Sequence, residues 1–266
     1  MIPTFLSTAL YLLTAAGFAW RLAAGPEHVP WRTALLATGG VGVVVHTAVL
    51  WGQMDTGAGL NLGFFNAASL VAALMALIVI LGALQRPVEN LMVFILPVAA
   101  VIELINQFLG TGVAPITRFP GGLEVHVITS IIAFAVLSIA VVQALVLAWQ
   151  DRRLRHRHPG GIIRALPPLQ EMEHLLFQMI RLGFVLLTLA LITGTFYLED
   201  LFAQHLAHKT VFSVAAWAIF ALLLFGRWRY GWRGRTAIRW TLGGFAALLL
   251  AYFGTKLVLE LILGRG

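Results

Sequence analysis

Four ionisable side chains lie within, or at the ends of, long apolar stretches of this 266-residue chain. His46 lies in VGVVVHTAVLWGQ and Glu103 in AAVIELINQFLG, while His126 and His208 each stand at the start of a further apolar stretch. Ionisable groups are costly inside a bilayer, so they usually face the interior of a helix bundle and mark functional sites. Two neutral imidazoles from different helices suit axial ligation of haem iron, which is the first chemistry that these residues indicate.

The surroundings of His126 favour a flat ligand. Ser130 and Ala133 follow it at i+4 and i+7, so one face of the expected helix is small. Haem also needs cations for its propionates, and Arg118 or Lys209 could supply them. Spacing alone does not establish haem binding, because ligands carried on helices have no fixed sequence signature.

Other interpretations remain open at this point. Asn106 and Gln107 follow Glu103 at i+3 and i+4, so an ion or proton path through His46 and Glu103 is a second hypothesis. Lys256 and Glu260 are spaced as an i,i+4 pair at the end of the last apolar stretch. A third hypothesis is a membrane partner that holds no ligand.

The composition predicts a polytopic membrane protein. Sixty per cent of the residues are apolar and 11% are charged, whereas a soluble domain carries about 25% charge. The chain has no cysteine, which excludes disulfides, iron–sulfur clusters and covalent CxxCH haem attachment. The net charge of +7 comes from arginines grouped in short loops, which is typical of membrane orientation and not of nucleic-acid binding. Nothing resembles a nucleotide-binding loop or a catalytic triad, so an enzyme is the least supported class.

Apolar runs of about 20 residues are long enough to cross a bilayer core of about 30 Å. We therefore predict an all-α fold with eight transmembrane helices, at 3–22, 33–52, 64–84, 90–109, 125–149, 174–197, 209–226 and 236–260. Pro97 is expected to break the fourth. Residues 1–266 are interpreted as a single domain, with a cytoplasmic loop and an amphipathic lead-in to the sixth span at 150–174.

The arginines predict the orientation of the chain. They gather in alternate loops, including 152–164 and 227–239, and basic loops face the cytoplasm. Eight spans then place both termini outside. On this topology His46, Glu103, His126, His208 and Lys256 all fall in the outer half of the protein, and we expect imidazoles from separate spans to converge in one outer cavity.

The second half of the chain resembles a known family. HVITSIIAFAVLSIA, which begins at His126, is similar to the haem-ligand helix of the cytochrome c assembly membrane proteins (the CcsA/CcmC type). HKTVFSVAAWAIFALLLFGRWRYGWRGRTAIRWTLGGFAALLLAYFG resembles their last two spans, and LPPLQEMEHLLFQMIRLGFVLLTLALITGTF is most similar to the YpjD branch. The resemblance agrees with the plan of eight spans.

The resemblance implies that two outer histidines ligate haem. His126 matches the first by its motif, and His208 occupies the region of the second; His46 is a candidate internal ligand. The chain departs from the haem-handling members at 197–210, where YLEDLFAQHLAHKT stands in place of a tryptophan-rich motif. A histidine near the inner end of the penultimate span also has no counterpart in LLLFGRW.

We therefore expect a protein of the bacterial inner membrane that binds or handles haem near the outer half of the bilayer. Its expected partners are membrane lipid, haem and other membrane proteins, with no nucleic acid. The alternative is a non-haem accessory subunit of a transporter or other membrane complex, in which Glu103 and His46 serve structure or ion passage.

Overall fold

The computed structural model describes residues 1–25, 31–57, 59–86, 88–110, 123–155, 166–197 and 207–254. Within these ranges, eight helices are long and apolar enough to cross a membrane, as the sequence predicts. Their residues fall into two compact units, which are described separately. The interpretation of the whole chain as a single domain stays a prediction.

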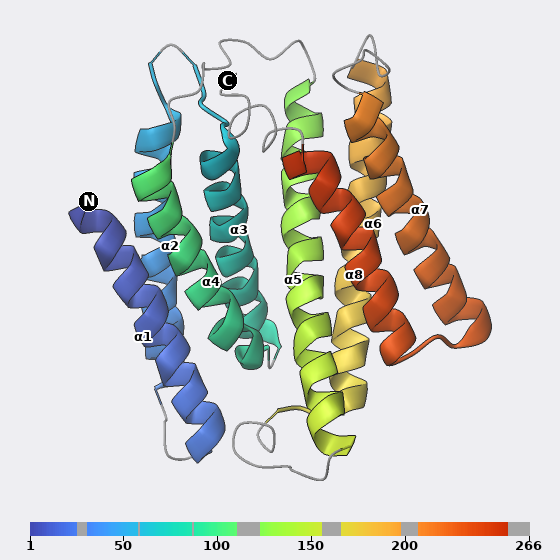
Figure 1. Ribbon diagram of the computed structural model, residues 1–266. Coiled ribbons are helices and arrows are strands. Elements are labelled where there is room, and N and C mark those ends of the chain that lie inside the picture. The colour runs from blue at the N-terminus through green and yellow to red at the C-terminus, as the bar shows by residue number, and fades with distance from the viewer. Residues whose placement is uncertain are drawn as a thin grey trace. The chain divides into compact units, whose positions relative to one another are not determined.

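Unit 1 contains four helices that run alternately up and down (Figure 1). They are α1 (Ile2–Ala24), α2 (Arg32–Met54), α3 (Phe64–Gln85) and α4 (Glu89–Leu109). Each is 21–23 residues long and rises about 1.5 Å per residue, which suffices to span the bilayer core. Along the chain each helix packs on the next, and α4 closes the bundle by packing on α1.

Glycines allow α1 and α2 to pack closely. A Cβ atom on Gly42 would lie 3.1 Å from the ring of Tyr11, and one on Gly39 would lie 3.1 Å from Thr14 Cγ2. Small residues at helix interfaces are common in membranes, where close packing replaces the hydrophobic effect as the force that associates helices. This contact brings Tyr11 against the middle of α2.

One end of unit 1 is held by an ionic cluster. Glu89 begins α4 and accepts hydrogen bonds from Arg21 on α1, at 3.3 Å, and from Arg32 on α2. Arg32 also donates to the backbone carbonyl of Ala83 near the end of α3. All four helices are therefore tied together at this end.

The prediction that Pro97 breaks the fourth span is wrong. Helix α4 runs without interruption from Glu89 to Leu109, with Pro97 inside it. A proline costs a membrane helix one backbone hydrogen bond, and packing against neighbouring helices makes this tolerable. Buried residues on both sides of Pro97 supply that packing here: Ile95, Leu96, Ala99 and Ala100.

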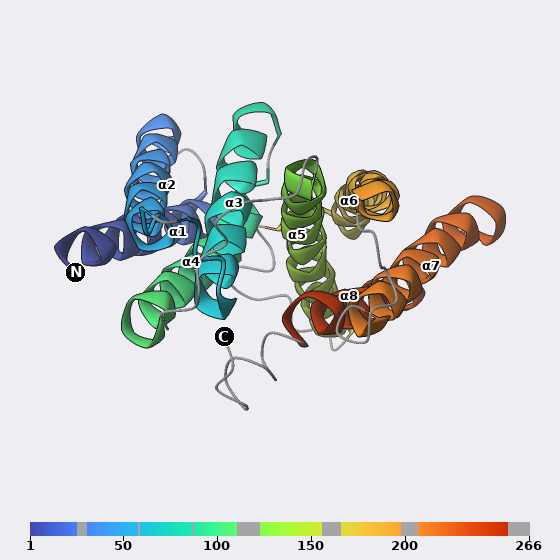
Figure 2. The same ribbon diagram turned by 90° about the horizontal axis from the view of Figure 1, so that it is seen from above.

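Unit 2 contains the other four helices apart from the last four residues of α5, and α6 and α8 lie on either side of the line from α5 to α7 (Figure 2). They are α5 (Leu123–Arg155), α6 (Leu169–Tyr197), α7 (Ala207–Tyr230) and α8 (Arg235–Leu249), and the π-helix η2 (Leu250–Gly254) continues α8. Aromatic contacts hold the unit together: Phe134 of α5 packs on Phe245, and Phe184 of α6 stacks on Trp217 of α7.

The end of α5 and the start of α6 both lie inside the segment 150–174, for which the sequence predicts a loop and an amphipathic lead-in. Helix α5 continues to Arg155, because the arginines at its end propagate a helix well and interact favourably with the C-terminal end of its dipole. Helix α6 starts directly after Pro168, so the amphipathic lead-in and the sixth span form one helix of 29 residues. Met172 and Leu176 are fully buried on its apolar face, while Glu171 is exposed. The interpretation of this segment as an amphipathic lead-in stays a prediction.

Candidate functional site

His126 lies in the first turns of α5 and contacts the last turns of α6. Its Nδ1 atom lies 2.7 Å from the backbone carbonyl oxygen of Ala190. A carbonyl can only accept a hydrogen bond, so Nδ1 carries a proton and donates it. In the neutral ring the lone pair is then on Nε2, and among the described residues no side chain or backbone group bonds to this atom.

The imidazole of His126 lies very close to the backbone of α6 at Gly194. A Cβ atom placed on Gly194 would lie 2.9 Å from Cε1 and 3.0 Å from Nδ1 of the ring. Contacts this short force a neighbour to shift, so the glycine is what lets the ring approach α6 closely enough to reach Ala190. Sequence reasoning identified His126 but not Gly194, because nothing in the local pattern LITGTFY distinguishes that glycine.

Histidines that bind metals usually have the hydrogen-bonding arrangement seen at His126. Such a residue donates its second N–H to a carbonyl or carboxylate, which fixes the tautomer and makes the free nitrogen a better ligand. His126 is half-buried and shows this arrangement within unit 2. The residues present around His126 therefore fit a single axial ligand of haem iron.

The backbone of His208 lies in the first turn of α7. Figure 1 shows that the start of α7 is at the same end of unit 2 as the start of α5 and the end of α6. The side chain of His208 lies outside the described residues, as do Arg118 and Lys256. Their predicted roles stay predictions.

His46 lies in unit 1, fully buried, and both of its ring nitrogens are already engaged. Nδ1 lies 3.2 Å from the hydroxyl of Tyr11, and Nε2 lies 2.9 Å from the hydroxyl of Ser69. Ligation of iron by His46, as the sequence suggested, would require one of these bonds to be given up. The shared outer cavity with His126 also stays a prediction.

Glu103 lies beside His46. One carboxylate oxygen accepts a hydrogen bond from Ser7, and the other lies 3.8 Å from Nδ1 of His46. The role of Glu103 in an ion or proton path with His46 stays a prediction. Ser7 as the partner of Glu103 and Tyr11 as the partner of His46 were missed, since these helices are far apart in sequence and periodicity does not show which helices pack together.

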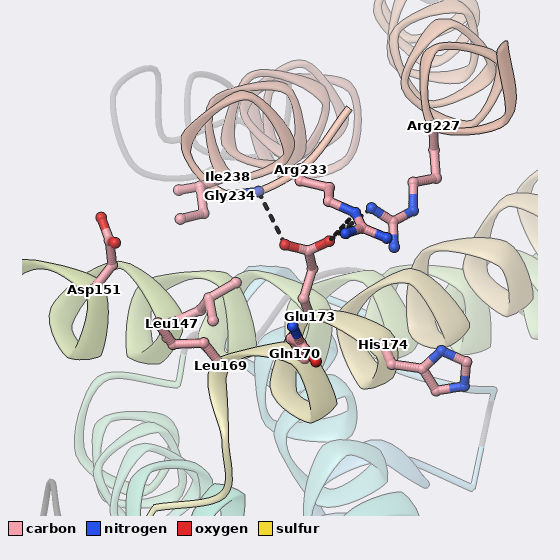
Figure 3. A pocket seen from close by; sticks show the side chains of 10 residues that line it. All are labelled: Leu147, Asp151, Leu169, Gln170, Glu173, His174, Arg227, Arg233, Gly234 and Ile238. Carbon is pink, nitrogen blue, oxygen red and sulfur yellow. Dashed lines mark hydrogen bonds and ion pairs between the residues drawn. The ribbon is translucent and has the colours of Figure 1, made fainter. Parts of the chain in front are cut away.

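A cavity of about 350 Å³ lies at the end of unit 2 away from His126. Figure 3 shows Glu173 pointing between two arginines and the backbone N–H of Gly234. Glu173 lies 2.7 Å from Arg227 and 3.7 Å from Arg233, and accepts a bond of 3.0 Å from Gly234. Gly234 has a φ of 51°, a conformation that favours glycine. Glu173 thus joins α6 to α7 and to the start of α8.

Comparison with known proteins gives one family. The family model described as "Cytochrome C assembly protein" matches residues 36–263. The inner membrane protein YpjD of Escherichia coli K12 is 34% identical over 238 residues, which covers 87% of this chain and 89% of that protein. No solved structure matches.

More distant relatives are similar over shorter stretches. Protein HemX of Brevibacillus brevis is 25% identical over 134 residues, or 50% of this chain and 49% of its own. The cytochrome c biogenesis protein CcsA of Prochlorococcus marinus is 32% identical over 89 residues, or 33% of this chain and 28% of its own.

Proposed function

The chain belongs to the cytochrome c assembly protein family, and we propose that it binds haem at the end of unit 2 where α5 begins. His126 is one axial ligand, through Nε2. The observation that carries the proposal is the bond from Nδ1 to the carbonyl of Ala190, which leaves Nε2 as the nitrogen that can bind iron. Haem, when bound, would supply a redox-active iron.

The residues around His126 position the ring. Ala190 fixes its tautomer and Gly194 fixes its distance from α6. Both lie on a regular helix, and a ligand supported by rigid elements holds its geometry better than one on a loop. Ala133, one per cent exposed, keeps the face of α5 below the ring small.

His208 is the second axial ligand in this proposal. Its region resembles that of the second haem-ligand histidine of the family, and its backbone lies in the first turn of α7. The start of α7 and the start of α5 share one end of unit 2 (Figure 1).

The setting of the site is the bacterial inner membrane, in agreement with the name of the Escherichia coli relative. The apolar residues exposed on the helices are expected to contact lipid, for example Val185, Leu189 and Leu222. Haem and other membrane proteins are the proposed partners. The family relation supports a role in haem handling, and the direction of any haem transfer is not part of the proposal.

A hemin titration of the purified protein tests this function. We expect the wild-type protein to bind hemin with a Soret band that His126→Ala loses. His174→Ala is the matched control, because His174 is an exposed histidine near the other end of α6 and should leave binding unchanged. A folded wild-type protein that takes up no hemin would reject the proposal and favour the non-haem accessory subunit.

A further inference from the structure

Unit 1 contains a buried polar network that the proposed haem site does not use. It joins all four helices: Tyr11 and Ser7 on α1, His46 on α2, Ser69 on α3 and Glu103 on α4. Each of these side chains is at most two per cent exposed. Ionisable groups held inside a membrane bundle are expensive and therefore call for a functional explanation.

In the part of the chain that the structure describes, no lysine or arginine forms an ion pair with Glu103. Among the described residues, the ion-pair contacts of Glu103 are limited to His46, at 3.8 Å. The carboxylate oxygen that faces His46 makes no hydrogen bond in the described part of the protein. An isolated buried carboxylate costs several kcal/mol, so the neutral acid is the form that this environment favours.

The groups that face Glu103 come from each neighbouring helix and carry no fixed charge. Helix α1 contributes Tyr11 and Ser7, and α2 contributes His46. From α3, Ser69 reaches the network through Nε2 of His46. A proton that enters or leaves the carboxyl therefore changes the charge of the whole network by one.

A second group of hydrogen-bonded polar side chains lies between the network and one end of the unit. Thr4 donates to the amide oxygen of Gln107 at 2.9 Å, and Gln53 donates to the same oxygen at 3.1 Å. Asn106 donates to Gln53 at 2.7 Å. Gln53 and Gln107 are partly exposed, so polar side chains lead from the surface to Glu103. At about 1.5 Å per residue, Glu103 lies about 9 Å from the end of α4 at Leu109.

Toward the other end, an apolar layer separates the network from the ionic cluster of Arg21, Arg32 and Glu89. Glu103 comes fourteen positions after Glu89 on α4, a rise of about 21 Å. Most buried side chains along this distance are apolar, among them Phe18, Leu36, Val79 and Leu96. In the described part of unit 1 the buried polar exceptions along it are Thr14, whose hydroxyl bonds the carbonyl of Leu10, and Asn90 beside the ionic cluster.

We propose that Glu103 is a proton-binding site that loads from one side of the membrane, through the end of unit 1 where α2 and α4 terminate. On loading, hydronium transfers its proton to the carboxylate oxygen that faces His46 and leaves as water; on release, water or hydroxide takes the proton back. Ser7 bonds the other oxygen and positions the carboxyl. The site is independent of haem binding in unit 2.

Infrared difference spectroscopy of the membrane-reconstituted protein tests the proposal. We expect a carboxylic C=O band that titrates reversibly with pH, shifts in D₂O and is absent from Glu103→Gln. Glu124→Gln is the matched control, because Glu124 is exposed at the start of α5 and its loss should leave this band intact. Ser7→Ala should move the band without removing it, which keeps the test valid if Glu103→Gln does not fold.

The path is tested by the rate at which the band shifts in D₂O. Gln107→Leu should slow the exchange at least several-fold. Thr14→Val, a buried change on the apolar side of the network, should leave the rate unchanged. The proposal is overturned if the band does not change with pH, if no band is lost in a folded Glu103→Gln protein, or if Thr14→Val slows the exchange and Gln107→Leu does not.

Discussion

Substitution of Gly194 by alanine should weaken haem binding without removing the ligand. The new Cβ would lie 2.9 Å from Cε1 of His126. Carbon atoms pack at about 3.5 Å or more, so the ring must retreat by about 0.6 Å, the difference between these distances. The bond from Nδ1 to Ala190, now 2.7 Å, then lengthens to about 3.3 Å, beyond the usual range for such bonds.

The loss of hemin affinity can be estimated from the weakening of the hydrogen bond between His126 and Ala190. A hydrogen bond of this kind contributes about 1 kcal/mol, and loss of the group that orients a metal ligand typically costs 10–100-fold in affinity. We therefore expect the dissociation constant for hemin to rise by about tenfold in Gly194→Ala. Gly243→Ala is the control, since a Cβ atom there meets nothing within 4 Å and the residue is exposed on α8.

Two assays measure this effect. Hemin titration followed at the Soret band gives the affinity, and the ¹⁵N chemical shifts of His126 in selectively labelled protein report the Nδ1 bond without any haem. If a folded Gly194→Ala protein kept the ¹⁵N chemical shifts and the hemin affinity of the wild type, the position of the His126 ring would not depend on its contact with Gly194. That result would refute the reasoning.

Three further predictions concern stability and topology. Glu89→Gln should lower the thermal unfolding temperature in detergent, because Arg21 and Arg32 lose a half-buried partner worth about 1–3 kcal/mol. Glu173→Gln should lower the unfolding temperature by a similar amount. Added salt should reduce the difference in unfolding temperature between this variant and the wild type, since the contacts of Glu173 with Arg227 and Arg233 are partly exposed. A wild-type melting curve for either variant would contradict the assigned ion pairs. A reporter fused to the C-terminus should be active outside the cytoplasm, and activity only in the cytoplasm would reverse the predicted orientation.

The sequence was sufficient to predict the helices because each membrane span needs about 20 apolar residues, and such runs are visible in one dimension. It failed at Pro97, where neighbouring helices compensate for a lost backbone bond. It also failed at Arg155, where α5 continues past the apolar run. Tertiary packing, which local sequence does not report, decided the first case. In the second, charged residues that favour a helix extend it beyond the apolar run by which the span was recognised.

The candidate sites were predictable by residue type but not by partner. His126, His46 and Glu103 stand out because ionisable groups are rare in apolar spans. Their partners Ala190 and Ser7 are a carbonyl and a hydroxyl on other helices, which no local pattern marks. The hydrogen bond from Nδ1 of His126 to Ala190 leaves Nε2 as the nitrogen that can bind iron, and this bond is visible only in three dimensions.

The central claim is that Nε2 of His126 binds haem iron. The most direct measurement is the absorption spectrum of the protein purified from membranes of cells that make haem. The account predicts a Soret band in the wild-type protein and its loss in a folded His126→Ala protein. A Soret band of equal strength in both proteins, or no band in a wild-type protein that also takes up no added hemin, would contradict it.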